Sequence, residues 1–453
     1  MSAPAFHDPD PYAALRVPNY RAYLLGSFLA NLGRQAVTVA AAWEIYTWTH
    51  SATALGLVGL VNVIPLLVLS LPAGVLADRV DRRRIIGWSQ LAAAVISGAL
   101  VALSVGRDRG WIPAWGPLRA GNALVRAVAG VFERHAAPGE LHFDEPALPL
   151  MFVLLLVLAC VRILAWPARA SLLPRLLPRS ALGNAITWNA SAFEIATVAG
   201  PALAGFLVAG LGYRAVYLLD VVLGVTFCVL LRRVRYLDAG GPASGPAARP
   251  HWLEGAKFIW SRKVILGASA LDLFATLLGG ATMLLPVFAD QILHTGPIGL
   301  GWLRAAPSLG ACVMAMRLAH RDPMVRPGRS MLWAVAGFGG AILVFGLSHW
   351  FWLSFAALVV SGACDNVSVV VRSSLVQFLT PDALRGRVTG VNQMFIGSSN
   401  EIGALRAGLM GALVGPVAAV LIGGAGTLAV VAAVAWAVPP LRRLPALHTL
   451  RAG

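Results

Sequence analysis

A small set of charged side chains interrupts the long apolar runs of this sequence, and these residues are the ones that could do chemistry. In apolar surroundings a lone charge is costly, so each of these side chains needs a partner or an aqueous cavity. A carboxylate in such a place can take up a proton, and an arginine can hold an anion or pair with a carboxylate. The candidates are Arg34, Glu44, Arg162, Glu194, Asp220, Asp272, Arg304, Asp365, Glu401 and Arg406.

Some members of this set fit a packing role at least as well as a chemical one. Glu44 and Asp220 lie near the ends of their apolar runs, where a local partner can satisfy them. For Glu194, Arg304, Glu401 and Arg406, a packing role with a local partner also explains the charge at least as well as a chemical role does. The sequence contains no Gly-x-x-x-x-Gly-Lys-Ser/Thr phosphate cradle, no convincing catalytic triad and no zinc helix. We therefore expect no enzyme, no catalytic residue, no metal and no cofactor.

The elements that position these residues are membrane helices. Hydrophobic residues make up 58% of the chain and charged residues only 12%, and the mean hydropathy is +0.74. A soluble domain carries about twice that share of charge. A chain of 453 residues is long enough for a dozen spans of about 20 residues each. All four cysteines fall inside apolar runs, which favours small packing residues over a disulfide frame or a metal cluster.

The apolar runs predict an all-α membrane protein with twelve transmembrane helices. Most of the 36 Lys and Arg lie in the tails and on the connections of one side, so both termini, 1–20 and 439–453, are expected in the cytosol. The net charge of +16 is dispersed over many short loops, which argues against nucleic acid as a partner. The predicted spans are 21–48, 52–77, 84–106, 148–170, 182–211, 214–231, 263–289, 297–318, 330–348, 351–373, 387–412 and 415–438.

An internal repeat divides the spans into two pseudo-symmetric six-helix halves, 21–231 and 263–438. The segment Arg169-Ala170-Ser171-Leu172 recurs as Arg372-Ser373-Ser374-Leu375, at an offset of 203 residues. The segment His50-Ser51 recurs as His294-Thr295, at an offset of 244 residues. The difference places about 41 extra residues in the first half.

The two long polar stretches are an insert at 107–147 and a linker at 232–262. We expect the insert on the outer side, as a lid or a spacer. Its His135 and His142 stand beside acidic residues, but their spacing matches no familiar metal-ligand set. The linker continues from a Gly/Pro-rich run into an amphipathic helix that starts near Trp252. A second amphipathic helix, lying at the membrane surface, is predicted in the insert from one face that carries Leu124, Val128, Val131 and Phe132.

A basic junction follows the second span directly, from Gly74 to Arg84. An aspartate at the edge of hydrocarbon needs a helix N-terminus or a guanidinium, and arginines behind it hold the loop in the cytosol. An ordinary basic stop would not demand the ordered Gly, Leu, Asp and Arg. The spacing resembles the signature loop of the major facilitator superfamily, Gly-x-Leu-Ala-Asp-Arg-x-Gly-Arg-Arg-x, with Asp81 in place of the second glycine. The resemblance implies a conformational latch made by Gly74, Leu76, Asp78, Arg79, Arg82 and Arg83.

A second motif lies in the fifth predicted span, from Gly200 to Gly205. It resembles the Gly-Pro-x-x-Gly-Gly core of the antiporter motif of exporting members, with Ala204 replacing one glycine. Pro201 removes a backbone hydrogen bond, and the glycines let a neighbouring helix approach closely. The motif residues Gly200, Pro201 and Gly205 are therefore expected to bend this span at the interface of the halves, although simple tight packing explains them too.

The resemblance covers the chain apart from the insert and is closest to the enterobactin-exporter branch, which Leu271-Asp272-Leu273-Phe274 and Leu303-Arg304-Ala305-Ala306-Pro307 also match. It implies the major facilitator fold and a proton-coupled exporter of a small amphipathic molecule, a siderophore or a drug. Such a protein would act as a monomer in the bilayer of the inner (plasma) membrane, by alternating access. An uptake permease or a lysophospholipid flippase of the same fold is the alternative.

The family's architecture also ranks the charged residues, because spans 1, 4, 7 and 10 line its central cavity. Arg162 and Asp365 differ by the repeat offset of 203, so we expect them at equivalent depth in opposite halves, where they can pair across the cavity. The residues promoted for substrate or proton binding are Arg34, Glu44, Arg162, Asp272 and Asp365.

Overall fold

The regular structure of the chain is helical wherever the structure describes it. The computed structural model describes residues 12–112, 116–132, 143, 145–178, 181–234, 252–320, 324 and 326–444. Over these residues the backbone forms helices and short connections, and no strand.

Helices lie at all twelve positions that the apolar runs predict. The first half contains α1 (Pro18–Thr49), α2 (Ala52–Arg79), α3 (Arg82–Asp108), α5 (Ala147–Leu172), α6 (Leu182–Leu211) and α7 (Tyr213–Arg233). The second half contains α9 (Lys263–Gly279), α11 (Gly296–Ala319), α12 (Pro327–Leu347), α13 (Phe351–Leu379), α14 (Asp382–Val414) and α15 (Pro416–Ala437). Among the described residues, ten stretches are long and apolar enough to cross a membrane. Helices α1 and α14 are as long but stand outside that set.

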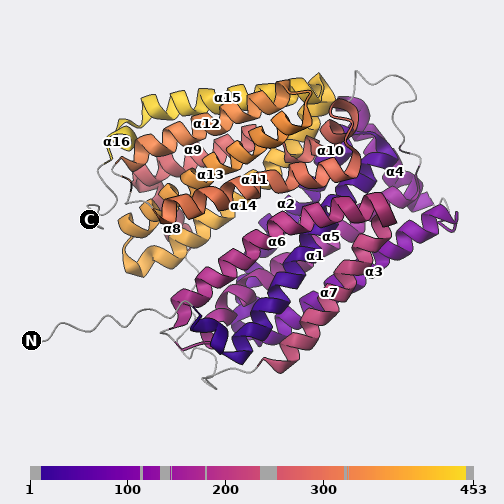
Figure 1. The fold of residues 1–453 in the computed structure, drawn as a ribbon, viewed down its shortest axis with the longest axis horizontal. Helices are drawn as coiled ribbons and strands as arrows, with labels where there is room; N and C mark the ends of the chain where they lie inside the picture. The colour runs from indigo at the N-terminus through magenta and orange to yellow at the C-terminus, as the bar shows by residue number, and fades with distance from the viewer. Residues whose placement is uncertain are drawn as a thin grey trace, which may run out of the picture.

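The two halves lie side by side, with the first half in indigo to magenta and the second in orange to yellow (Figure 1). Helix α2 packs along α14, and α6 packs along α11, so these four helices make most of the contact between the halves. We call the end of the bundle where α1 begins the terminal face, and the end where α1 finishes the gate face. The short helices α8 (Trp252–Ser261) and α16 (Pro439–Arg442) lie at the terminal face (Figure 1).

The backbone carries the internal repeat that the sequence predicts. His50, between α1 and α2, has φ 48°, and His294, at the matching connection of the second half, has φ 50°. Gly212, between α6 and α7, has φ 79°, and Gly415, between α14 and α15, has φ 86°. These left-handed residues are spaced by the same 244 and 203 residues as the sequence segments. The two halves therefore make the same turns at the same places.

Glycines let the halves approach closely near the gate face. A Cβ atom on Gly408 of α14 would lie 2.3 Å from the Cα atom of Gly56 in α2. A Cβ atom on Gly205 of α6 would lie 3.2 Å from the Cα atom of Gly301 in α11. Both contacts join one half to the other, and neither leaves room for a side chain.

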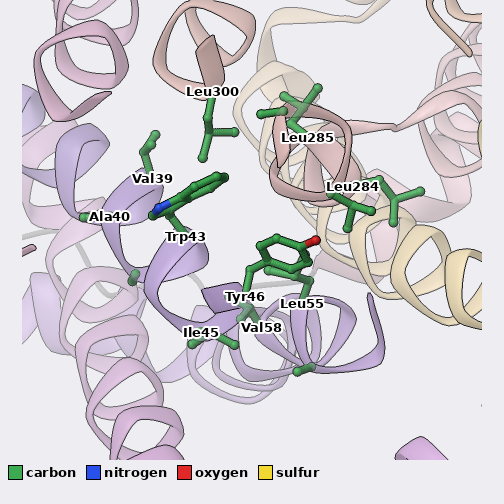
Figure 2. Packing of buried hydrophobic residues seen from close by; sticks show 14 of the residues in the cluster. Val39, Ala40, Trp43, Ile45, Tyr46, Leu55, Val58, Leu284, Leu285 and Leu300 are labelled. Atoms are coloured by element: carbon green, nitrogen blue, oxygen red, sulfur yellow. The ribbon is translucent and has the colours of Figure 1, made fainter. Parts of the chain in front are cut away.

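Apolar side chains from both halves form one buried cluster near the same face. Trp43 and Tyr46 of α1 point toward Leu284, Leu285 and Leu300 of the second half (Figure 2). The Tyr46 hydroxyl also donates a hydrogen bond to Asp290 Oδ2, at 3.2 Å. The gate face is therefore closed by packing and by polar contacts of Tyr46 with the second half.

The seventh predicted span is not one helix. Helix α9 ends at Gly279, and the chain continues through a 3-10 turn, η4 (Thr282–Leu284), a short helix, α10 (Leu285–Val287), and a π-helix, η5 (Phe288–Ile292). Gly280 has an extended backbone, with φ −65° and ψ 104°. The glycine-rich sequence at this point weakens a helix, since glycine has the most backbone freedom to lose. The stretch Lys263–Ile292 as a whole is long and apolar enough to cross a membrane, so the predicted span over 263–289 is present with an interrupted helix.

The insert contains a helix, α4 (Gly116–Phe132), at the gate face (Figure 1). It packs against α2 and α5 of its own half and against α14 of the other half. Its buried residues are Asn122, Val125 and Ala129, whereas Leu124 and Val131 of the predicted apolar face are exposed. The contact of that face with the membrane surface stays a prediction. His135 and His142 lie outside the described residues.

Candidate functional site

A cavity of about 290 Å³ inside the first half collects several of the predicted charged residues. Arg34 comes from the middle of α1, Arg162 from α5 and Asp220 from α7, and Arg169 lies two turns beyond Arg162. The close approach of α1 to α7 depends on Gly33, because a Cβ atom there would lie 2.3 Å from Asp220 Oδ1. The cavity thus gathers three guanidinium groups around a single carboxylate.

The arginines of this cavity are only partly compensated. Asp220 Oδ2 accepts a hydrogen bond from Ser97 at 2.6 Å and is close enough to Arg34 and Arg162 to interact with their charges. Arg169 donates to the neutral Gln90 Oε1 at 2.9 Å, and its Nε atom has no hydrogen-bond partner. Among the described residues, Arg162 makes no hydrogen bond and no ion pair within 4.0 Å. Three positive charges therefore share one negative charge.

Aromatic rings form part of the cavity wall. The guanidinium of Arg34 lies 5.8 Å from the ring centroid of Phe193 in the wall, and that of Arg169 lies 5.7 Å from the ring centroid of Phe227, which lies outside the cavity lining. Tyr23 and Trp166 also line the cavity. Such contacts hold a guanidinium in place without cancelling its charge.

The second half holds a different charge cluster, on α9 and α13. Arg372 Nη1 lies 2.6 Å from Asp272 Oδ2, and the two side chains are only 4% and 5% exposed. Ser368 donates a hydrogen bond to Asp272 Oδ1 at 3.2 Å. Asp365 lies two turns from Arg372 on the same helix, within electrostatic reach of both members of the pair. This cluster has two carboxylates and one guanidinium, the reverse of the balance in the first half.

The predicted pairing of Arg162 with Asp365 is absent from this conformation. Arg162 interacts electrostatically with Asp220, and Asp365 interacts with Asp272 and Arg372. No ion pair within 4.0 Å joins Arg162 to Asp365. Each residue instead interacts with an opposite charge in its own half, Arg162 with Asp220 on α7 and Asp365 with Arg372 on its own helix α13.

The other promoted residue of span 1, Glu44, is satisfied locally. It is 1% exposed and accepts a hydrogen bond of 2.5 Å from the Tyr217 hydroxyl. It lies in the last turns of α1, toward the gate face, away from both charge clusters. Glu194, on α6, is half-buried, and no hydrogen bond or ion pair is described for it.

Arg304 and Arg406 contact the broken seventh span. Arg304 of α11 donates a hydrogen bond to the carbonyl of Thr282 at 3.2 Å, and Arg406 of α14 donates to the carbonyl of Leu278. Both carbonyls flank the break, where helical partners are lost. Glu401 of α14 is hydrogen-bonded to Asn62 of α2 and interacts with the charge of Arg304, so it belongs to the contact between the halves.

The signature loop connects α2 to α3 at the terminal face. Asp81, the residue that departs from the family pattern, caps α3, because its Oδ1 accepts a hydrogen bond from the Arg84 amide at 3.0 Å. Arg83 donates to the carbonyl of Arg232 at the end of α7, at 2.7 Å. Arg79 is exposed, and the space around Gly74 is open. The side chain of Asp78 lies outside the described residues.

The antiporter-like motif lies at two contacts of α6. A Cβ atom on Gly200 would lie 2.6 Å from Gln35 Cβ in α1, within the first half. Gly205 meets Gly301 across the interface of the halves, and a Cβ atom on Gly301 would lie 2.6 Å from the carbonyl oxygen of Pro201. The motif thus joins the cavity helix α1 to the other half.

Sequence reasoning ranked three residues of these clusters too low. Arg169 and Arg372 were visible only as members of a repeat, and that repeat was the signal that could have promoted them. Asp220 was placed near a span end and read as packing. Its partners, Arg34 and Arg162, come from helices far away in the sequence, so no local pattern reveals the contact.

The chain is similar to known proteins along about nine-tenths of its length. The family model described as the Major Facilitator Superfamily matches residues 23–347. The enterobactin exporter EntS of Citrobacter koseri is 28% identical over 415 residues, which cover 91% of this chain and 90% of that protein. EntS of Escherichia coli O1:K1 / APEC is 27% identical and covers 91% of this chain and 89% of that protein.

Solved structures share the fold at lower identity. The xylose transporter XylE from E. coli, in an inward open conformation, is 12% identical with a TM-score of 0.64, covering 93% of this chain and 96% of that one. A bacterial homolog of the human lysosomal transporter Spinster, inward-facing and occupied, is 14% identical with a TM-score of 0.62, covering 96% of this chain and 99% of that one.

Proposed function

The chain belongs to the Major Facilitator Superfamily and is a multi-pass membrane transporter, and from that premise we propose that it exports a small amphipathic molecule in exchange for protons. The export direction is supported by the likeness to enterobactin exporters along about nine-tenths of both chains. It is supported as well by the antiporter-like motif at Gly200, Pro201 and Gly205. A siderophore is the first substrate to test, with drugs as the second class.

The observation that carries proton coupling is the Asp272–Arg372 pair with Asp365 beside it. The Asp272–Arg372 pair is almost fully buried. Asp365 lies on the same helix as Arg372, and its side chain is accessible to water. A proton on Asp365 or Asp272 leaves the positive charge of Arg372 without compensation, which changes the cost of burying this cluster. Proton binding is thereby linked to a rearrangement of α9 against α13.

Alternating access is supported by the position of the contacts between the halves. The close glycine pairs, the Tyr46–Asp290 hydrogen bond and the shared apolar cluster all lie toward the gate face. With both termini in the cytosol, as the positive-inside rule favours, this conformation is closed on the outside. Export then requires these contacts to open while the signature loop closes the terminal face.

Transport in vesicles tests this function. The purified full chain is reconstituted into proteoliposomes that are loaded with a labelled siderophore, and an imposed proton gradient starts the reaction. We expect siderophore efflux that stops when a protonophore is added. The substitution Asp365→Asn should reduce the rate of this efflux at least tenfold. Asp108→Asn, a neutralisation of an exposed aspartate at the gate face, is the matched control.

The same vesicles separate the alternative functions. Gradient-driven entry of the substrate without exit identifies an uptake permease. Movement of a labelled lysophospholipid between leaflets, with no siderophore efflux, identifies a flippase. Either result overturns the proposed export.

A further inference from the structure

The cavity of the first half carries an excess of positive charge that nothing in the described protein cancels. Arg34, Arg162 and Arg169 face one carboxylate, Asp220, which leaves a balance of about two positive charges. Arginine stays protonated in proteins, so the excess cannot be removed by losing protons. Buried charge of this kind is costly in apolar surroundings, and a negatively charged ligand relieves that cost.

The repeat shows that this excess is specific to the first half. Arg372 is the repeat equivalent of Arg169, and it is neutralised by Asp272 at 2.6 Å. Arg169 instead donates to the neutral Gln90 of α3 at 2.9 Å, and among the described residues it forms no ion pair with a carboxylate within 4.0 Å. The same guanidinium is thus part of a closed ion pair in one half and is available to a ligand in the other.

The wall of the cavity favours a ligand with a flat apolar part. Phe193, Trp166 and Tyr23 line it beside the arginines. Aromatic walls and guanidinium groups together recognise a planar ring that bears anionic groups, since the ring stacks while the charges take bidentate hydrogen bonds. The volume of about 290 Å³ is at the small end of ligand pockets, which fits one such moiety of a larger molecule.

We propose that the cavity lined by Arg34, Arg162 and Arg169 is a binding site for an aromatic anion of about two negative charges. The site takes such a moiety of the transported molecule, and only this assignment to transport rests on the proposed function. Asp220 holds the arginines in place and sets how much negative charge the site accepts.

Binding to the purified full chain in nanodiscs tests the charge requirement. The probes are terephthalate, benzoate and the uncharged terephthalamide, measured by calorimetry and by the fluorescence of Trp166 and its neighbours. We expect terephthalate to bind at least tenfold more tightly than terephthalamide, with benzoate between them. The affinity for terephthalate should fall as the salt concentration rises from about 50 to about 300 mM, because salt screens partly exposed charges. Equal affinities for the charged and uncharged probes overturn the proposal.

Aliphatic anions test the aromatic requirement and separate a lipid headgroup from a free aromatic ligand. Adipate has two carboxylates and no ring, and sn-glycerol 3-phosphate stands in for a lipid headgroup. We expect both to bind several-fold more weakly than terephthalate. Tighter binding of glycerol phosphate assigns the site to a phosphate-bearing lipid and overturns the aromatic part of the proposal.

Two substitutions that change the charge of the cavity in opposite directions distinguish an electrostatic effect from damage to the fold. Arg162→Gln should weaken terephthalate binding at least tenfold, whereas Asp220→Asn should strengthen it, because the balance of charge moves in opposite directions. Arg317→Gln, an exposed arginine near the end of α11, is the matched control and should bind as wild type does. Equal weakening by Arg162→Gln and Asp220→Asn contradicts the proposal. If either variant does not fold, the wild-type probe series still decides.

Binding and transport fail separately. Terephthalate binding without any gradient-driven efflux leaves the anion site standing and sinks the proposed function. If the protein exports a siderophore but binds charged and uncharged probes equally, the proposed function stands and the anion site is refuted.

Discussion

Two arginines at equivalent positions, Arg169 and Arg372, show how a single partner changes what a residue can do. Arg372 is closed into a buried ion pair with Asp272, and Arg169 is not. The sequence predicted their equivalence through the repeat. It could not predict their partners, because Gln90 and Asp272 come from helices that no local pattern places beside α5 and α13.

The buried Asp272–Arg372 pair gives a prediction for stability. Arg372→Ala should lower the free energy of unfolding by about 3–5 kcal/mol, because it leaves the Asp272 carboxylate buried without compensation. The double variant Asp272→Asn/Arg372→Ala should recover part of that loss. Unfolding of the purified protein in detergent, followed by tryptophan fluorescence, measures both. Losses that simply add in this double-mutant cycle would mean that the two side chains do not act as a pair.

The signature loop gives a prediction for transport. Asp78→Asn should reduce efflux severely while leaving membrane insertion and abundance near wild type, since the motif places this carboxylate among the arginines at the end of α2. Asp81→Asn is a matched control, because asparagine caps a helix about as well as aspartate does. Efflux is measured in proteoliposomes and abundance by immunoblot of membranes. Wild-type efflux from Asp78→Asn would refute the latch.

At the scale of elements, the sequence predicted the position of every long helix but missed the interruption of the seventh span. Hydropathy predicted the helices because an apolar stretch inside lipid must satisfy its backbone hydrogen bonds within itself, and a helix does so. The break after Gly279 leaves carbonyl groups without helical partners, and Arg304 and Arg406 supply donors from α11 and α14. Both arginines were read as less certain site residues, since apolar periodicity says nothing of a backbone acceptor on another helix.

This arrangement makes the guanidinium of Arg406 one of the two donors that satisfy the break. Arg406→Met keeps an unbranched apolar stem and removes the donor to the Leu278 carbonyl. The expected loss is about 1–3 kcal/mol of stability, the cost of an unsatisfied buried acceptor. Thermal unfolding in detergent measures it. Arg317→Met serves as the control, and equal effects of the two substitutions would contradict a capping role.

The bend expected in α6 stays a prediction, and the contacts of its motif now specify it. Pro201→Ala restores a backbone donor and leaves the Gly205–Gly301 contact intact. The rate of efflux should fall, or protons should leak, by more than stability falls. Turnover and leak are followed by a pH-sensitive dye inside vesicles. An unchanged rate together with an unchanged leak would assign the motif to packing alone.

At the scale of the whole molecule, the halves are held together near the gate face by glycines that have no room for a side chain. Gly408→Leu should therefore force this face apart and shift the population toward the opposite conformation. Gly390→Leu, on the same helix with no atom near its Cβ position, is the matched control. Spin labels at the exposed Leu211 and Trp350, both near the gate face, report the distance between the halves. An unchanged distance distribution in Gly408→Leu would mean that this contact does not hold the gate.

The single-residue connections at Gly212 and Gly415 also bear on how the chain enters the membrane during synthesis. Helices α6 and α7, and likewise α14 and α15, are separated by one left-handed glycine, so each pair is a hairpin with no spare length. Helix α14 carries Glu401 and Arg406 and is not among the stretches that are long and apolar enough to cross a membrane, whereas α15 is. We therefore expect the two helices to enter the bilayer together as one hairpin.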